Sequence, residues 1–272
     1  MNLEFDSEDE VEVTSYTPPI KPTLRQSCLG LLWGFAEGLA LLFRYPYMIK
    51  LLGVSCLYEV VVTILDYQFK VMGSSSVQAS VHSLTPAGSV EAGNRFAQLL
   101  GHFGQFTNIL SFLLSFFGFS YLVHQMGVPR ALLIFPTTLF MAVVVTNLVP
   151  SMWVLFVMVS IMKAVIFSLH DPVKELLYIP TSEAIKYKAK AWIDVFGARL
   201  AKAIGSTICT VAGKGMGASA SQVRRTAEIP SLLIAALIVG ITWSIGADFT
   251  ALIESNTIVG SDLVEKRAGG KG

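Results

Sequence analysis

The sequence predicts an all-α polytopic membrane protein with six transmembrane helices and one amphipathic helix at the membrane interface. Of its 272 residues, 53% are hydrophobic and only 14% are charged, whereas about 25% of a soluble domain is charged. So few charges cannot cover a water-exposed surface, which argues against a soluble enzyme and a nucleic-acid-binding protein. The apolar residues form long runs without alternation, so the chain is expected to cross lipid as helices and not as barrel strands.

The two ends of the chain are polar. Residues 1–26 are rich in carboxylates and proline, which is typical of a disordered acidic arm and unlike a basic targeting peptide. Residues 254–272 are rich in Gly and Lys and are expected to form a flexible C-terminal tail. The six-helix transmembrane domain is expected between these ends, over residues 45–253.

An apolar stretch at residues 27–44 precedes the first clear span. It contains Glu37 and has Gly30, Gly34 and Gly38 at four-residue spacing. The charge and the borderline length predict a helix at the membrane interface, although a seventh span is the alternative. The glycine stripe predicts close contact with another helix.

Six further segments are apolar enough, over about 20 residues, to cross about 30 Å of hydrocarbon. They are residues 46–69, 96–123, 128–148, 151–169, 192–213 and 230–252. The Ser- and Gly-rich residues 73–95 are expected to form a loop, as are 124–130 and 170–191. Lys and Arg are more numerous in the loops on the side of the two termini, which predicts that both termini face the cytoplasm-like side.

Motifs of soluble chemistry do not occur in the sequence. Cys28, Cys56 and Cys209 are far apart and belong to no Cys/His cluster, so they are expected to pack in apolar surroundings and not to bind metal. The sequence has no nucleotide-binding P-loop, no serine-hydrolase GxSxG and no HExxH zinc motif. It therefore predicts no metal, no cofactor and no enzymatic activity.

Ionisable residues inside the spans are the candidate functional residues, because an ionised group at bilayer depth costs about 2.5–3.5 kcal/mol. In the first span Glu59, Thr63, Asp66 and Lys70 share one helical face. We expect Glu59 and Asp66 to line a pathway. The alternative for Lys70 is a local pair with Asp66 at the helix end.

Three later cations and one carboxylate complete the candidate site. Lys163 has no acidic residue one turn away, so we expect it to pair across helices or to face a cavity. Arg199 and Lys202 are neighbours on one face of the fifth span, and Asp194 lies near the start of that span. Two cations on a cavity wall suit an anionic substrate. The alternative is a charge cluster that orients the helix near the membrane surface.

Amides and one histidine form a stripe in the second span. Its members are Gln98, His102, Gln105 and Asn108. Such a stripe either binds a polar solute or joins helices through hydrogen bonds, so His102, Gln105 and Asn108 are secondary candidates, together with Lys70.

One stretch resembles a known family. It reads Asp171-Pro-Val-Lys-Glu-Leu-Leu-Tyr-Ile-Pro180, then Lys186-Tyr-Lys-Ala-Lys-Ala-Trp-Ile-Asp194, then Arg199-Leu-Ala-Lys202-Ala-Ile-Gly205. It resembles the ATP/ADP translocases, which are nucleotide transporters of plastids and intracellular bacteria and distant relatives of the major facilitator superfamily. The resemblance implies alternating-access exchange of ATP for ADP, with Lys202 and Asp66 at positions of charged residues important for transport. The family's Gly-Lys-Ser-Gly is Ala201-Lys202-Ala-Ile204 here, and Asp66 replaces its Glu.

The resemblance also implies partners and a location. Such transporters have about twelve helices in two six-helix halves, and this chain resembles the C-terminal half. It implies ATP and ADP as substrates, the lipid bilayer as surroundings, and an N-terminal six-helix half or a second copy as partner. It implies a plastid envelope or a bacterial-type inner membrane. The alternatives are a non-transporting membrane scaffold or partner subunit with the same half-fold, and a carrier of another anionic metabolite.

Overall fold

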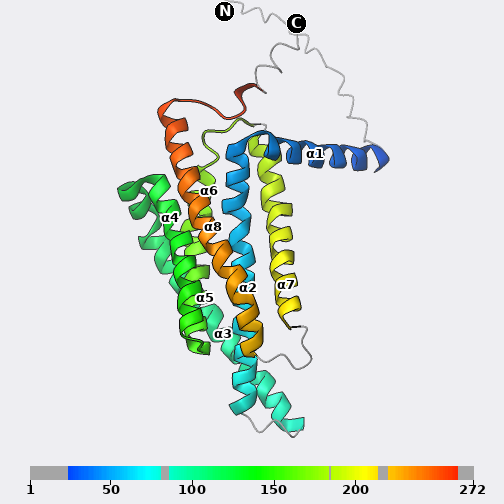
Figure 1. The fold of residues 1–272 in the computed structure, drawn as a ribbon, viewed down its shortest axis with the longest axis vertical. Coiled ribbons are helices and arrows are strands. Elements are labelled where there is room, and N and C mark those ends of the chain that lie inside the picture. The colour runs from blue at the N-terminus through cyan, green and yellow to red at the C-terminus, as the bar shows by residue number, and fades with distance from the viewer. Residues whose placement is uncertain (1–23, 81–85, 184, 214–219, 263–272) are drawn as a thin grey trace, which may run out of the picture.

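A computed structural model of the chain describes residues 24–80, 86–183, 185–213 and 220–262 (Figure 1). Within these ranges the elements are helical, apart from an isolated bridge between Thr181 and Val259. The helices are α1 (Leu24–Arg44), α2 (Pro46–Ser80), α3 (Pro86–Phe117), α4 (Phe119–Leu148), α5 (Met152–Val165), α6 (Asp171–Leu176), α7 (Ala198–Gly213) and α8 (Ala220–Glu254). The π-helical turns are η1 (Ile166–His170), η2 (Ile185–Ala189) and η3 (Trp192–Gly197). The predicted all-α fold is confirmed.

The long helices form a bundle in which α2, α4 and α7 run one way and α3, α5 and α8 run the other (Figure 1). Among the described residues, five segments are long and apolar enough to cross a membrane: Pro46–Ser80, Tyr121–Leu148, Met152–Leu176, Ile185–Ala212 and Ala227–Glu254. The 32-residue α3 is not among them, because the polar side chains of its stripe lower its hydropathy. It nevertheless packs along α5 within the bundle.

The loop predicted at residues 73–95 is largely helical, so this prediction is wrong. α2 continues to Ser80 and α3 begins at Pro86, and this helical pair extends past the end of α7 (Figure 1). The hydroxyls of Ser74, Ser75 and Ser80 donate to carbonyl oxygens three residues earlier. These bonds satisfy the serine hydroxyls inside a helix, so a serine-rich composition does not by itself indicate a loop.

The break between the second and third spans falls at Gly127, inside the connection expected at 124–130. The helix α3 ends at Phe117, and α4 includes all of residues 124–130, so the connection is a kink and not an extended loop. Gly118 keeps right-handed helical angles (φ −97°, ψ −49°), its amide donates to the Leu114 carbonyl, and its own carbonyl accepts from the Leu122 amide, so helical bonding continues through it. A Cβ atom there would lie 2.5 Å from the Leu114 carbonyl oxygen, which favours glycine. Gly127 adopts φ 75° and ψ 164° inside α4, a left-handed conformation that kinks the helix two residues before Pro129.

The helix α2 is the centre of the bundle and packs on α5, α7 and α8. Its residues Leu51, Val54, Val61 and Ile64 are fully buried. Cys56 and Cys209 are buried free thiols, and Cys28 lies where side chains are not described.

Two glycines bring α7 and η3 close to α2. A Cβ atom at Gly205 would lie 2.9 Å from the Val60 carbonyl oxygen, and one at Gly197 would lie 2.6 Å from Cys56 Sγ. Such contacts allow backbones to approach closely in membrane helices. They place the intervening Lys202 beside α2.

The helix α1 lies across the ends of the other helices (Figure 1) and contacts η2 and α2. A Cβ atom at Gly38 would lie 3.0 Å from the Lys188 carbonyl oxygen, whereas one at Gly34 would meet nothing within 4 Å. Glu37 forms an ion pair with Lys188. The glycine stripe therefore makes its close contact at Gly38, and the packing at Gly30 is outside the described part.

The first part of the tail predicted at 254–272 is held in place. The Val259 amide donates to the Pro180 carbonyl and the Ser182 amide donates to the Val259 carbonyl, both at 2.9 Å. Asp262 accepts hydrogen bonds from Arg44 and the Tyr45 hydroxyl at 2.6 Å. Burial and the Asp262 carboxylate raise the pKa of the Tyr45 phenol, which keeps it a donor. Residues 263–272 and the arm at 1–23 lie outside the described residues.

We expect Gly205→Ala to destabilise the bundle by about 1–3 kcal/mol, because the added methyl forces α7 away from α2. Gly240→Ala on α8 is the matched control, because its Cβ atom would meet nothing within 4 Å and alanine favours the helix by about 1 kcal/mol. Thermal unfolding of the purified chain in detergent measures both. Equal melting temperatures for the two variants would contradict this packing.

Candidate functional site

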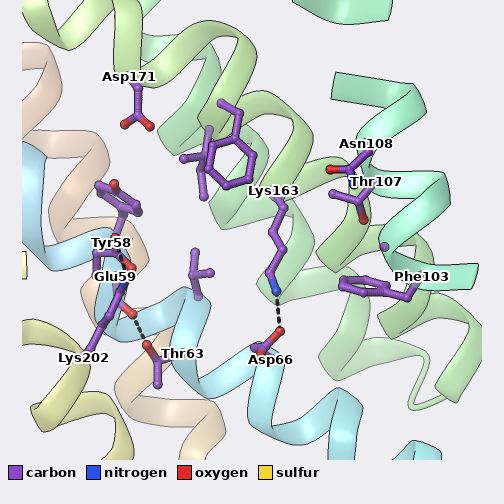
Figure 2. A pocket seen from close by; sticks show the side chains of 14 residues that line it. Tyr58, Glu59, Thr63, Asp66, Phe103, Thr107, Asn108, Lys163, Asp171 and Lys202 are labelled. Carbon is purple, nitrogen blue, oxygen red and sulfur yellow. Dashed lines mark hydrogen bonds and ion pairs between the residues drawn. The ribbon is translucent and has the colours of Figure 1, made fainter. Parts of the chain in front are cut away.

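Two adjoining cavities of about 540 and 550 Å³ open on one side of α2. The first is lined by Tyr58, Glu59, Val62, Thr63, Asp66, Phe103, Gly104, Thr107, Asn108, Lys163, Ile166, Phe167, Asp171 and Lys202 (Figure 2). The second is lined by Ser55, Tyr58, Glu59, Phe167, Asp171, Pro172, Lys174, Glu175, Asp194, Ala198, Arg199 and Lys202. They share Tyr58, Glu59, Phe167, Asp171 and Lys202. Both volumes lie in the range of small-molecule sites.

The pair of Asp66 and Lys163 joins α2 to α5 across the first cavity (Figure 2). Lys163 Nζ donates to Asp66 Oδ1 at 2.6 Å, and Lys70 Nζ lies 2.7 Å from Asp66 Oδ2. The side chains of Asp66 and Lys163 are 20% and 28% exposed. Asp66 therefore takes part both in the local pair with Lys70 and in a pair across helices.

A looser pair joins α2 to α7. Lys202 Nζ lies 3.5 Å from Glu59 Oε1, with the lysine side chain 50% exposed and the carboxylate 16% exposed. The Thr63 hydroxyl donates to the Glu59 backbone carbonyl at 2.6 Å, so its hydrogen bond is made within α2 and not to Lys202. Lys202 is consequently held more loosely by Glu59 than Lys163 is by Asp66.

The second cavity carries a mixed set of charges. Lys174 Nζ lies 3.7 Å from both Asp171 Oδ1 and Asp194 Oδ1. Arg199 also lines this cavity. The π-helical turns η1 and η3 contribute Phe167 and Asp194, and such turns often occur at functional sites. The described residues hold no group of three or more His, Cys, Asp or Glu suited to a metal ion.

The six main candidate residues all line these cavities. Glu59 and Lys202 line both, and the others are divided between them. Asp66 and Lys163 line the first, whereas Asp194 and Arg199 line the second. Their roles in binding and transport stay predictions.

The secondary candidates are divided. Asn108 lines the first cavity, and Lys70 reaches the site only through Asp66. His102 and Gln105 are exposed and are not among the lining residues. The face of α3 that lines the cavity therefore contains Asn108 but not His102 or Gln105, so it only partly coincides with the expected stripe.

Sequence reasoning missed several lining residues: Tyr58, Phe103, Gly104, Thr107, Phe167 and Lys174. Phe103 and Thr107 are one turn apart, next to Gly104 and Asn108, so a helical projection centred on Thr107 identifies this face. Thr107 Oγ1 and Ser55 Oγ are buried and lack a hydrogen-bond partner among the described residues. One such hydroxyl lies in the wall of each cavity.

Comparison with known proteins identifies relatives of the chain. A family model described as TLC ATP/ADP transporter matches residues 32–248. Proteins named ADP,ATP carrier protein 1 match from Chlamydia trachomatis serovar D, with 26% identity over 192 residues, and from Chlamydia muridarum, with 27% over 192 residues. Each match covers 63% of this chain and 34% of the relative, so the chain spans about a third of the length of these curated relatives. No solved structure matches the chain.

Proposed function

Because the chain belongs to the TLC ATP/ADP transporter family, we propose that it binds adenine nucleotides in the two adjoining cavities and exchanges ATP for ADP by alternating access. The observation that carries this proposal is the arrangement of Asp66–Lys163 and Glu59–Lys202 beside one hollow within the bundle. Charges at bilayer depth are costly and generally mark substrate pathways.

The ion pairs suggest how an empty site keeps its charges compensated. Lys163 and Lys202 bind Asp66 and Glu59 when no substrate is present, and turn to phosphate groups when a nucleotide enters. Arg199 and Lys174 add cations at the second cavity. Because removing one partner of a buried pair is strongly destabilising, this exchange of partners keeps both lysines neutralised, with and without nucleotide, as the bundle alternates between two states. Asp66 keeps Lys70 as its partner when Lys163 turns to phosphate.

The cavities are open on one side, which favours a second polypeptide that covers this side and completes the site. Lys202 is half exposed although it lines both cavities. We propose that an N-terminal six-helix half or a second copy of the chain covers this side, as in two-half transporters.

We propose the membrane arrangement that the sequence predicts. Residues 45–253 span the bilayer of a plastid envelope or a bacterial-type inner membrane, with an interfacial helix at 27–44. An acidic arm at 1–26 and a tail at 254–272 lie on the cytoplasm-like side. The N-terminal end of α2 and the C-terminal end of α8 lie at the same end of the bundle, which supports this topology (Figure 1).

Counter-exchange in liposomes tests the function. The chain is reconstituted into liposomes loaded with ADP, with sulfate, or with buffer, and uptake of labelled ATP is measured. We expect uptake to depend on internal ADP. Equilibrium binding of ATP to the purified chain in detergent measures recognition without a partner body. Absence of binding would contradict the proposal, and equal uptake under the three loadings would contradict exchange.

A further inference from the structure

One side of the first cavity is an uncharged face of α3, made of Phe103, Gly104, Thr107 and Asn108. In Figure 2, Phe103, Thr107 and Asn108 lie on one side of the cavity, whereas Glu59 and Lys202 lie on the other. The Asp66–Lys163 pair stands between them. The α3 face is thus uncharged, with the Lys163 ammonium at its edge, 5.1 Å from the centroid of the Phe103 ring.

Thr107 offers a hydroxyl that its own helix does not use. Thr63, Thr138 and Thr146 each donate to the carbonyl oxygen four residues earlier. Thr107 is only 5% exposed, yet Oγ1 has no hydrogen-bond partner among the described residues. A buried hydroxyl without a partner is unfavourable. A rotation about χ1 that turns Oγ1 into the adjoining cavity would let a ligand satisfy it.

The neighbouring residues leave space and supply an aromatic surface. A Cβ atom at Gly104 would meet nothing within 4 Å. The ring of Phe103 packs against Phe69, at 4.8 Å between centroids, and also lies under the Lys163 ammonium, at 5.1 Å. Phe167 lines both cavities and is 60% exposed, so its ring is available for stacking.

We propose that this α3 face binds the heteroaromatic base of a nucleotide, with Thr107 and Asn108 reading its polar edge and Phe167 stacking on its ring. This inference rests on the proposed function and adds the orientation of the ligand. The Asn108 amide carries a donor and an acceptor and the Thr107 hydroxyl can be either, which suits the mixed edge of a purine. Stacking on an aromatic ring tolerates every base, so selectivity falls to the two polar residues. The phosphates then extend toward Lys163 and Lys202.

Competition binding tests the assignment. Purified wild-type chain and variants in detergent bind labelled ATP in competition with ATP, GTP or tripolyphosphate, which has no base. We expect Thr107→Val and Asn108→Ala to weaken ATP about tenfold, which corresponds to one or two lost hydrogen bonds. Tripolyphosphate binding is expected to stay unchanged, and the preference for ATP over GTP to shift. Thr137→Val is the matched control, because Thr137 is exposed and is bonded to its own helix.

Different outcomes separate the two proposals. If wild-type chain does not bind ATP, the proposed function fails. If it binds ATP but Thr107→Val and Asn108→Ala weaken ATP and tripolyphosphate equally, or weaken neither, the base assignment is wrong. Gly104→Leu adds a variant that fills the cavity: it is expected to exclude both nucleotides and keep tripolyphosphate. Retention of nucleotide binding by this variant would also overturn the assignment. Thermal unfolding of each variant verifies that it is folded.

Discussion

Asp66→Asn is expected to destabilise the bundle by about 2 kcal/mol and to abolish nucleotide exchange. Asp66 contacts both Lys163 and Lys70, so its neutralisation leaves two lysines without a counter-charge. Removal of one partner of a buried pair costs about 3–5 kcal/mol. We expect about 2 kcal/mol instead, because Asp66 and Lys163 are 20% and 28% exposed and water screens their interaction in part. Thermal unfolding in detergent and ATP uptake into ADP-loaded liposomes measure the two effects.

The double variant Asp66→Asn with Lys163→Met separates stability from transport. Removing both charges eliminates the uncompensated lysine at the centre of the bundle, so most of the lost stability is expected to return. Exchange is not expected to return, because the cation proposed to meet phosphate is gone. Glu91→Gln is the matched control, because it breaks an exposed pair with Arg95 worth at most about 1 kcal/mol. A double variant no more stable than Asp66→Asn would show that the two residues are not coupled.

The sequence was sufficient to predict the class of fold and the charged part of the candidate site. Low charge and long apolar runs identify lipid-spanning helices, because the bilayer leaves the backbone few alternatives. Glu59, Asp66, Lys163 and Lys202 stand out because charge inside such helices is expensive. The structure brings them to one hollow.

The remaining features depend on contacts between helices. The kink at Gly127 arises from backbone geometry, whereas hydropathy suggests one long span followed by a loop. The predicted polar face of α3 included His102 and Gln105, whereas the face that lines the cavity includes Gly104 and Thr107. The prediction chose the more polar side chains, and the two faces adjoin each other on the helix. Single-helix periodicity cannot tell which polar side chains face neighbours and which face the outside.

Lys202→Gln is expected to reduce ATP uptake about 10–100-fold and leave stability nearly unchanged. A hydrogen bond to a charged group is worth about 1.5–3 kcal/mol, which corresponds to that change in rate or affinity. Its pair with Glu59 is long, at 3.5 Å, and the lysine is half exposed, so the pair adds at most about 1 kcal/mol. Uptake measured against ATP concentration checks this effect, with Lys50→Gln as the matched control, because Lys50 pairs with Asp248 outside both cavities. Unaltered uptake by Lys202→Gln would contradict the proposed role.

Glu59→Gln distinguishes a substrate cation from one that only orients the helix. If Lys202 alternates between Glu59 and phosphate, removal of the carboxylate frees the lysine for nucleotide but removes its partner in the empty state. In Glu59→Gln, ATP is therefore expected to bind more tightly and the maximal exchange rate to fall. In Lys202→Gln, ATP is expected to bind more weakly and the rate to fall. The two variants thus differ in the direction of the affinity change and agree in the direction of the rate change. If the charge cluster only orients α7, the two variants weaken binding alike. The sign of the binding change in Glu59→Gln thus decides between the two roles.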